Sequence, residues 1–416
     1  MIGPRLCCAQ HPRWCRGAGK THGHGVSNIP YTLITRDKEL NDLCARLATS
    51  EAFAFDTEFV GEDQYEPEIC LVQVATDDEC ALIDPQSGVD LTDFWQLIGD
   101  AELCKIVHAG SEDIAICRRL GRCDPRNVFD LQIAAGMVGL GYPASLAKLA
   151  KAVVGVTMHK SQTLTNWRKR PLTAEQLDYA AVDVAYLPRM HATIRQRLRS
   201  RKREEWAVEE SQRMCANAVR IVEPDDQRRR LKGAGSLSRR ELAVVDALLA
   251  ERDAIARERN RPPRTVLKDF LVIELARRGW TEPSKLATLR GMSLPQALLR
   301  RLGSAIERAR SAPPESHPPA LPSREHSEEE EIILSLLTGI LRDHCRQNAL
   351  AYSLLATRND LKDYARSVIN GSGSDPVVLR SGWRHQAVGK LLDAVLSGRS
   401  AVRIRQENGQ FHVHIE

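Results

Sequence analysis

The sequence contains no long apolar segment. No stretch approaches the about 18 to 20 uninterrupted apolar residues that a membrane-spanning helix requires. Charged residues make up 27% of the chain and hydrophobic residues 43%, which are ordinary proportions for a globular protein in water. We therefore expect a soluble protein with no membrane partner. The formal net charge of +5 permits a nucleic-acid partner but does not require one.

The sequence also lacks any pair of cysteines in the CxxC spacing. Its 11 cysteines are an odd number, and several lie in apolar segments, as Cys70 does. Scattered thiols of this kind are typical of buried free cysteines in a reducing compartment. We therefore predict a cytoplasmic location. The Cys and His residues near the N-terminus fit no standard zinc finger, so we disfavour a metal site there.

No acidic residue occurs in the first 28 positions, although several Arg, Lys and His residues do. A transit peptide is one interpretation, but the stretch is rich in glycine and has no amphipathic helical pattern. We favour a disordered basic tail, or a reading frame that starts too early. The fragment GAGK in this stretch lacks the rest of a P-loop.

Strand-like and helix-like patterns alternate after this tail and then give way to helical periodicity. The runs AFAFDTEF, ICLVQVAT, ECALIDP and KIVHAG predict strands, and alternation with helices predicts an α/β domain with a mixed sheet. Capping boxes, Ser238 with Glu241 and Ser327 with Glu330, open two later helical regions. The predicted boundaries are a tail over 1–28, an α/β domain over 29–218, a linker over 219–235, a helical domain over 236–311, a Pro-rich linker over 312–327, a second helical domain over 328–402 and a C-terminal tail over 403–416.

Two acids, Asp56 and Glu58, follow an apolar strand-like run and are separated by one residue. Side chains at positions i and i+2 of a strand point to the same face. We therefore expect the two carboxylates to lie side by side at the end of a strand, where their charges repel. An isolated Asp-x-Glu sequence at this position is most often part of a turn, so these two acids alone identify no site.

Two later segments carry the other candidate side chains. Asp113 lies in the first turn of a helix that we expect Ser111 to cap, where the helix dipole stabilises an anion. Tyr179 and Asp183 are four residues apart on a helix whose capping box begins at Thr173, so they share one face. Each feature is common by chance. Each feature alone is therefore a weak signal, but the three features in this order, each in its own strand or helix context, form a strong one.

The segments FDTEFV, IVHAGSEDI and LDYAAVDVAYL resemble the three exonuclease motifs of the ribonuclease D family, within the DEDD superfamily of 3'-to-5' exonucleases. Connecting segments such as CLVQVAT, VFDLQIAA and RPLTAEQ are also similar. Residues 236–311 resemble an HRDC domain, and NALAYSLLATRNDLKDYAR resembles the second helical unit of bacterial ribonuclease D. The resemblance implies an α/β, ribonuclease H-like exonuclease domain, with a mixed sheet flanked by helices, followed by two all-α HRDC-like domains.

The resemblance also implies what offsets the repulsion between the acids, because the family places two divalent ions among them. Carried over by motif, the metal ligands would be Asp56, Glu58, Asp113 and Asp183, and carboxylate oxygens suit Mg²⁺ or Mn²⁺. Tyr179 matches the tyrosine that orients the attacking water, which places the chain in the DEDDy branch. These five residues are the predicted catalytic residues of a two-metal in-line displacement.

Several other residues have roles that the sequence leaves open. His108 lies at the end of an apolar strand, where we favour a structural histidine over a general base. Gln73, Lys160 and Trp167 lie in family-like segments and either touch substrate or support the site. In the segment MHKSQ, His and Gln stand where relatives often have acids, which leaves the details of substrate binding open.

The first helical domain contains arginines that either contact phosphates or form a solvated helix face. Aromatic residues are only 5% of the chain, which disfavours tight sequence-specific binding of single strands and favours structured RNA with a single-stranded 3' end. The candidate arginines are Arg257, Arg259, Arg261, Arg264, Arg277, Arg278, Arg300 and Arg301.

The resemblance implies a 3'-to-5' exoribonuclease that releases 5'-mononucleotides, with tRNA precursors as substrates, and we expect a monomer. One alternative is a DNA exonuclease of the proofreading or helicase-associated type, although no polymerase or helicase motif accompanies the exonuclease motifs. The other is a non-catalytic RNA-binding scaffold, which the five intact motif residues disfavour.

Overall fold

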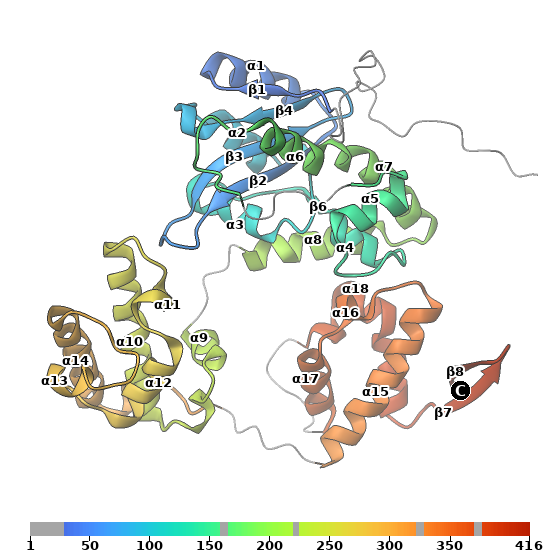
Figure 1. Cartoon of the computed structure of the whole chain (residues 1–416). Coiled ribbons are helices and arrows are strands. Elements are labelled where there is room, and N and C mark those ends of the chain that lie inside the picture. The colour runs from blue at the N-terminus through green and yellow to red at the C-terminus, as the bar shows by residue number, and fades with distance from the viewer. Residues whose placement is uncertain (1–28, 159–164, 219–223, 322–327, 370–376) are drawn as a thin grey trace, which may run out of the picture. The chain divides into compact units, whose positions relative to one another are not determined.

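The computed structural model describes residues 29–158, 165–218, 224–321, 328–369 and 377–416 (Figure 1). They form two compact units, one with the described residues of 29–58, 69–218 and 328–416 and the other with those of 59–68 and 224–321. The predicted basic tail, the segment with His159, Lys160 and Gln162, and the predicted cap Ser327 lie outside the described residues. Within the described ranges, no helix has the length and apolar character needed to cross a membrane.

The first unit contains a six-stranded mixed sheet with the strand order β1-β4-β3-β2-β5-β6. Strand β1 is parallel to β4, β4 is antiparallel to β3, and β2, β5 and β6 run parallel to one another. The predicted α/β fold with a mixed sheet is therefore confirmed. The strands are β1 (Thr32–Ile34), β2 (Ala52–Val60), β3 (Glu68–Ala75), β4 (Cys80–Ile83), β5 (Cys104–Val107) and β6 (Val128–Asp130).

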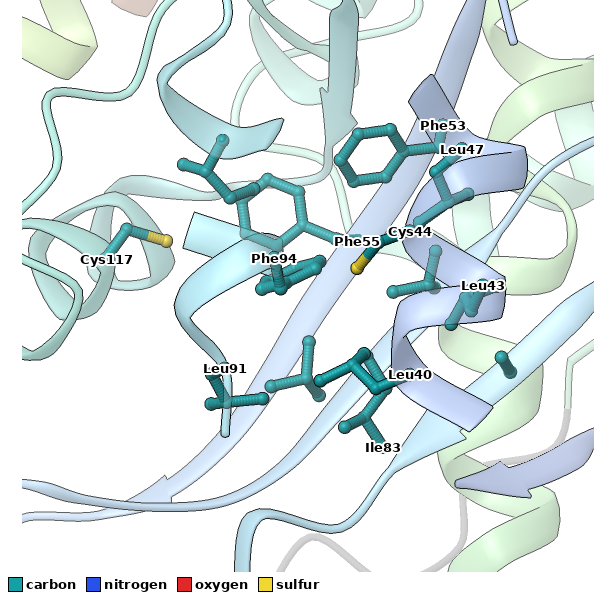
Figure 2. Close-up of a cluster of buried hydrophobic side chains, with 14 of the residues drawn as sticks. Leu40, Leu43, Cys44, Leu47, Phe53, Phe55, Ile83, Leu91, Phe94 and Cys117 are labelled. Atoms are coloured by element: carbon teal, nitrogen blue, oxygen red, sulfur yellow. The ribbon is translucent and has the colours of Figure 1, made fainter. Parts of the chain in front are cut away.

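Helices flank this sheet (Figure 1). Alternation along β2 places Phe53 and Phe55 on one face, where they join a buried cluster with α1 and α2. The helices of this part are α1 (Asp37–Ala48), α2 (Thr92–Gly99), α3 (Ser111–Leu120), α4 (Leu131–Gly136), α5 (Leu146–Val154), α6 (Ala174–Ala185), α7 (Leu187–Ser200) and α8 (Glu204–Ala218). Figure 2 shows ten labelled members of the cluster, namely Leu40, Leu43, Cys44, Leu47, Phe53, Phe55, Ile83, Leu91, Phe94 and Cys117.

The opposite face of β2 carries the two predicted acids. Strand β2 continues to Val60, so Asp56 and Glu58 lie within the strand and not at its end as expected. Helix α6 packs closely over this face of the sheet. Its residues Ala180 and Ala181 are fully buried, and the Cys80 thiol lies 4.0 Å from the carbonyl oxygen of Ala181. Apolar packing on one face therefore directs the acids toward α6 on the other.

The C-terminal part of the first unit is helical, as predicted, but it ends in a hairpin where we expected a tail. The hairpin turn contains Asn408 and Gly409, which have φ angles of 50° and 79°, as a tight Asn-Gly turn requires. The elements are α15 (Glu328–Gln347), α16 (Tyr352–Leu355), α17 (Arg358–Ile369), η5 (Val378–Arg380), α18 (Gly382–Arg384), η6 (His385–Gly389), α19 (Lys390–Leu396), β7 (Val402–Glu407) and β8 (Gln410–Ile415).

This C-terminal part is attached to α8 by a buried ion pair. The Arg384 guanidinium donates two hydrogen bonds to the Glu210 carboxylate, at 2.5 and 2.8 Å. Glu210 also accepts a hydrogen bond from the Trp383 indole at 2.8 Å, and Arg384 donates to two backbone carbonyls of α16. The side chains of Arg384 and Glu210 are only 8% and 12% exposed, so water does not replace these contacts.

We expect Arg384→Ala to lower the free energy of unfolding by about 3–5 kcal/mol, because it leaves the Glu210 charge buried and unpaired. Arg358→Ala is the control, since Arg358 and Glu331 form a pair whose side chains are 67% and 42% exposed, and such a pair contributes about 0–1 kcal/mol. Urea unfolding of both variants measures the difference. Equal losses would contradict the assigned importance of the buried pair.

The second unit contains the first helical domain. Its longest helix begins with the predicted capping box, in which Ser238 and Glu241 cap each other. Its first helix, α9, lies in the range predicted as a linker. The elements are α9 (Pro224–Arg230), η3 (Ala234–Ser236), α10 (Arg239–Glu258), α11 (Pro263–Val266), α12 (Asp269–Arg278), α13 (Pro283–Leu286), α14 (Gln296–Ser311) and η4 (Pro314–Ser316).

Candidate active site

The four predicted acids come from three elements and act on one another electrostatically. Asp56 and Glu58 project from β2, Asp113 lies in the first turn of α3, and Asp183 lies on α6. The charges of Asp113, Asp183 and Glu58 all raise the pKa of Asp56. The hydroxyl of Thr57, between the two β2 acids, donates a hydrogen bond of 2.5 Å to Asp113. The fold therefore gathers side chains that are up to 127 positions apart, from Asp56 to Asp183.

The start of α3 differs from the expected one. Gly110 occupies the N-cap position without a side-chain cap, and Ser111 is the first residue of the helix. Ser111 therefore does not cap α3, and the prediction was wrong on this point. Asp113 still lies in the first turn, where it is 7% exposed and close to the partial positive charge of the helix N-terminus.

Burial and mutual repulsion make these carboxylates hold their protons unusually tightly. Burial raises the pKa of Asp56 well above its usual range, and burial together with the charges of Asp183 and Asp113 raises the pKa of Glu58 to about 8. Burial raises the pKa of Asp183 to about 7, against the opposing effect of a hydrogen bond from Tyr179. Among the described residues, the main causes of the shifts of Glu58 and Asp183 include no Lys or Arg. A divalent cation placed among these four carboxylates would offset their mutual repulsion.

The donor set fits hard divalent cations. In the described ranges, no group of three or more Asp, Glu, His or Cys side chains converges closely enough to hold an ion by itself. Mg²⁺ does not need such a cage, because it usually keeps several waters and is held by one or two carboxylates together with substrate phosphates. Four neighbouring carboxylates that repel one another are suited to that kind of binding.

Tyr179 lies one helical turn before Asp183 and hydrogen-bonds to its carboxylate. Burial, followed by the charges of Asp183 and Glu58, raises the pKa of this phenol, so its hydroxyl stays protonated near neutral pH. The ring packs against Trp167, with the ring centroids 6.2 Å apart, and Trp167 is only 7% exposed. Trp167 therefore fixes the Tyr179 ring, which is a supporting role.

The loop before α6 is anchored by Arg170, which the sequence analysis did not single out. Its guanidinium donates to both carboxylate oxygens of Asp84, at 2.6 and 2.7 Å, and to the backbone oxygen of Cys70 at 2.7 Å. Helix α6 starts with the predicted capping box of Thr173 and Gln176. Because this box follows three residues after Arg170, the arginine sets where the helix with Tyr179 and Asp183 begins. The sequence feature that could have identified Arg170 is the Arg-Pro pair that stands just before the capping box of α6.

The remaining candidates are His108, Gln73 and Lys160. The Nε2 atom of His108 lies 2.9 Å from the backbone oxygen of Ala144, and burial lowers the pKa of the ring, which is the environment of a structural histidine. Gln73 of β3 is fully buried, and neither of its amide atoms has a partner among the described residues. Lys160 lies outside the described ranges.

Comparisons with known proteins agree with this geometry. A 3'-5' exonuclease family matches residues 31–199, and the HRDC domain family matches residues 241–306. Ribonuclease D of Nitrobacter hamburgensis is 32% identical over 380 residues, which cover 90% of this chain and 97% of that protein. Ribonuclease D of Bartonella henselae is 30% identical over 88% of this chain and 90% of its own length.

A solved structure agrees over the same length. The crystal structure of Escherichia coli RNase D, described as an exoribonuclease involved in structured RNA processing, matches with a TM-score of 0.80 and 27% identity. The match covers 89% of this chain and 99% of that one. The chain therefore belongs to the ribonuclease D family and is a 3'-to-5' exoribonuclease.

Proposed function

We propose that this exoribonuclease trims structured RNAs that have single-stranded 3' ends, tRNA precursors among them, and releases 5'-mononucleotides. The observation that carries the proposal is that four carboxylates which raise one another's pKa lie together with a protonated tyrosine hydroxyl. The relative from Escherichia coli acts in structured RNA processing, which supports the substrate class. The buried free thiols, such as Cys44 and Cys215, support a reducing, cytoplasmic location, and we propose a monomer.

The proposed cofactors are two divalent ions, Mg²⁺ or Mn²⁺, held by Asp56, Glu58, Asp113 and Asp183. When bound, the ions supply the positive charge that activates water and stabilises the departing 3' oxygen. Burial and the mutual repulsion of the acids, which raise the pKa of Asp56 and Glu58, support this assignment because bound cations would offset that repulsion. Exonucleases of this family depend on divalent metal ions, which agrees with it.

The protein's own groups orient the reactants. The Tyr179 hydroxyl orients the attacking water through hydrogen bonds, and it does not act as the base because its raised pKa keeps it protonated. Trp167 holds the Tyr179 ring, and Thr57 holds one oxygen of Asp113. Asp183 accepts the Tyr179 hydrogen bond and so fixes the direction in which the hydroxyl points.

The test is a time course on a 3'-extended tRNA transcript with Mg²⁺, beside a DNA strand of matched sequence. Wild type and Asp183→Asn are compared. We expect stepwise 3' shortening of the RNA by the wild type and none by the variant. Equal trimming of DNA would assign a general exonuclease instead. RNA binding without any trimming would assign a non-catalytic scaffold.

The arginines of the first helical domain separate into two groups. Arg264 and Arg278 pair with Asp269 and Glu274, and Arg301 pairs with two glutamates. Arg257 pairs with an aspartate one turn before it, and Arg277 donates to a serine hydroxyl. Of the eight candidate arginines, Arg259, Arg261 and Arg300 are the exposed ones that neither pair with an acid nor donate a side-chain hydrogen bond among the described residues.

We therefore propose that Arg259, Arg261 and Arg300 supply phosphate contacts. Replacing all three by Ala should reduce the slope of log Kd against log salt concentration by about 2, because each lost contact removes about 0.7–0.9. The control is a triple Ala variant of Arg264, Arg278 and Arg301, which lie in ion pairs. Binding of a structured RNA at several salt concentrations measures both slopes. A larger change in the control would contradict the assignment.

A further inference from the structure

A buried carboxylate outside the predicted catalytic set holds the turn between β5 and α3. Asp130 is the last residue of β6 and is 1% exposed. Its Oδ2 atom accepts a hydrogen bond of 2.9 Å from the backbone N–H of Gly110, the N-cap of α3. Its Oδ1 atom accepts hydrogen bonds of 2.7 and 3.1 Å from the N–H groups of Gln132 and Ile133, and so caps α4.

Asp130 is itself held from a third direction. Its backbone N–H donates to the hydroxyl of Ser211 on α8 at 3.1 Å, and that hydroxyl donates to the backbone oxygen of Ala207 at 2.8 Å. The carboxylate therefore stands at a fixed point between the sheet, α4 and α8. Because both of its oxygens are used, an amide side chain cannot replace it without losing one acceptor.

The turn that Asp130 holds has little freedom to adopt another shape. Ala109 has a φ angle of 57°, in the left-handed region that side chains disfavour. At Gly110 a Cβ atom would lie 2.5 Å from the side chain of Val107, so the backbone passes too close for any other residue. Asp113 follows three residues after Gly110, on the first turn that grows from this anchor.

We propose that Asp130 is a positioning residue for the exonuclease site. By holding the Gly110 N–H it sets where the first turn of α3 starts, and so where Asp113 meets Asp56 and Thr57. A displaced Asp113 would still be buried, but its oxygens would no longer lie where a shared ion needs them. The inference rests on the proposed roles of the acids as metal ligands.

The test variant is Asp130→Asn. Its side-chain oxygen can still cap α4, but its NH₂ group then faces the Gly110 N–H, so two donors oppose each other. We expect Mn²⁺ affinity to fall by about 10- to 100-fold, the usual effect of removing a group that orients a metal ligand. Free Mn²⁺ measured by electron paramagnetic resonance reports this affinity without any turnover. We also expect kcat to fall, with KM for RNA unchanged.

The matched control is Asp343→Asn. Asp343 is also buried, at 9% exposed, and accepts hydrogen bonds from Arg346, Gln347 and the backbone of Val413 in the C-terminal part of the chain. The Asp343→Asn variant should be less stable than the wild type but should bind Mn²⁺ with unchanged affinity. The same result for Asp130→Asn would overturn the inference. Mn²⁺ binding and activity of the wild type test the proposed function separately, so the two failures are distinguishable.

Two further measurements cover the case in which Asp130→Asn does not fold. Gly110→Ala displaces the same turn from the Val107 side and leaves Asp130 intact, so a folded variant should also bind Mn²⁺ more weakly. In the wild type, the Gly110 amide hydrogen should exchange slowly with solvent, because it is buried and bonded to Asp130. Unchanged Mn²⁺ affinity in Gly110→Ala, or rapid exchange at Gly110, would overturn the inference.

Discussion

Asp56→Asn should reduce kcat for 3' trimming of RNA by about a thousandfold or more. Asp56 is the acid on which the charges of Asp113, Asp183 and Glu58 all act, so it lies at the centre of the proposed metal site. Charge stabilisation by bound metal contributes several kcal/mol to the transition state, and about 4 kcal/mol corresponds to about a thousandfold in rate. Single-turnover trimming of a labelled RNA measures the loss.

Tyr179→Phe is the informative companion to this variant. It removes the hydroxyl but leaves the carboxylates and the ring contact with Trp167, so Mn²⁺ should still bind. Loss of one positioned hydroxyl should cost about a hundredfold in kcat.

Asp56→Asn should lose both metal binding and rate. If it instead retained a substantial part of the wild-type rate, the assignment of the acids as metal ligands would be wrong.

Removal of divalent ions should lower the melting temperature of the protein. Without cations, the buried carboxylates repel one another, and ions that bind only the folded state relieve this. An ion present at 100 times its Kd stabilises by about 2.7 kcal/mol, which is about 5–10 °C for a domain of this size class. Thermal unfolding in EDTA and in excess Mn²⁺ measures the shift.

The loss of stability in EDTA should grow as the pH rises. Glu58 and Asp183 have pKa values of about 8 and about 7 in the folded protein, and ordinary carboxyl values near 4 apply when it unfolds. The folded state therefore binds more protons between these limits, so stability is highest below about pH 4 for these groups and falls as the pH rises to about 8. The EDTA sample should melt lower at pH 8 than at pH 6.

Asp183→Asn provides the control for this result. The variant removes one charge from the repelling group, so it should melt higher than the wild type in EDTA at pH 8. It should also show little response to Mn²⁺. A wild type that melts at the same temperature with and without Mn²⁺ would show that these carboxylates bind no ion in the folded state.

The sequence by itself determined the local features of this protein. Strand β2 was predictable because its apolar residues form a continuous run, and the capping boxes at Thr173 and Ser238 were predictable because each depends on residues three positions apart. The spacing of Tyr179 and Asp183 required only the helical period. The family resemblance then assigned chemistry to these local patterns, and the comparisons confirmed the family.

Only the tertiary structure decided which distant groups meet. The bond from Gly110 to Asp130 and the clamp of Arg170 on Asp84 join residues 20 and 86 positions apart, and no local pattern encodes such partners. The same holds for the expected Ser111 cap, because the backbone before α3 starts the helix at Ser111 itself. Propensity and capping act within a few residues, whereas the position of a carboxylate in the site depends on how sheet and helices pack together.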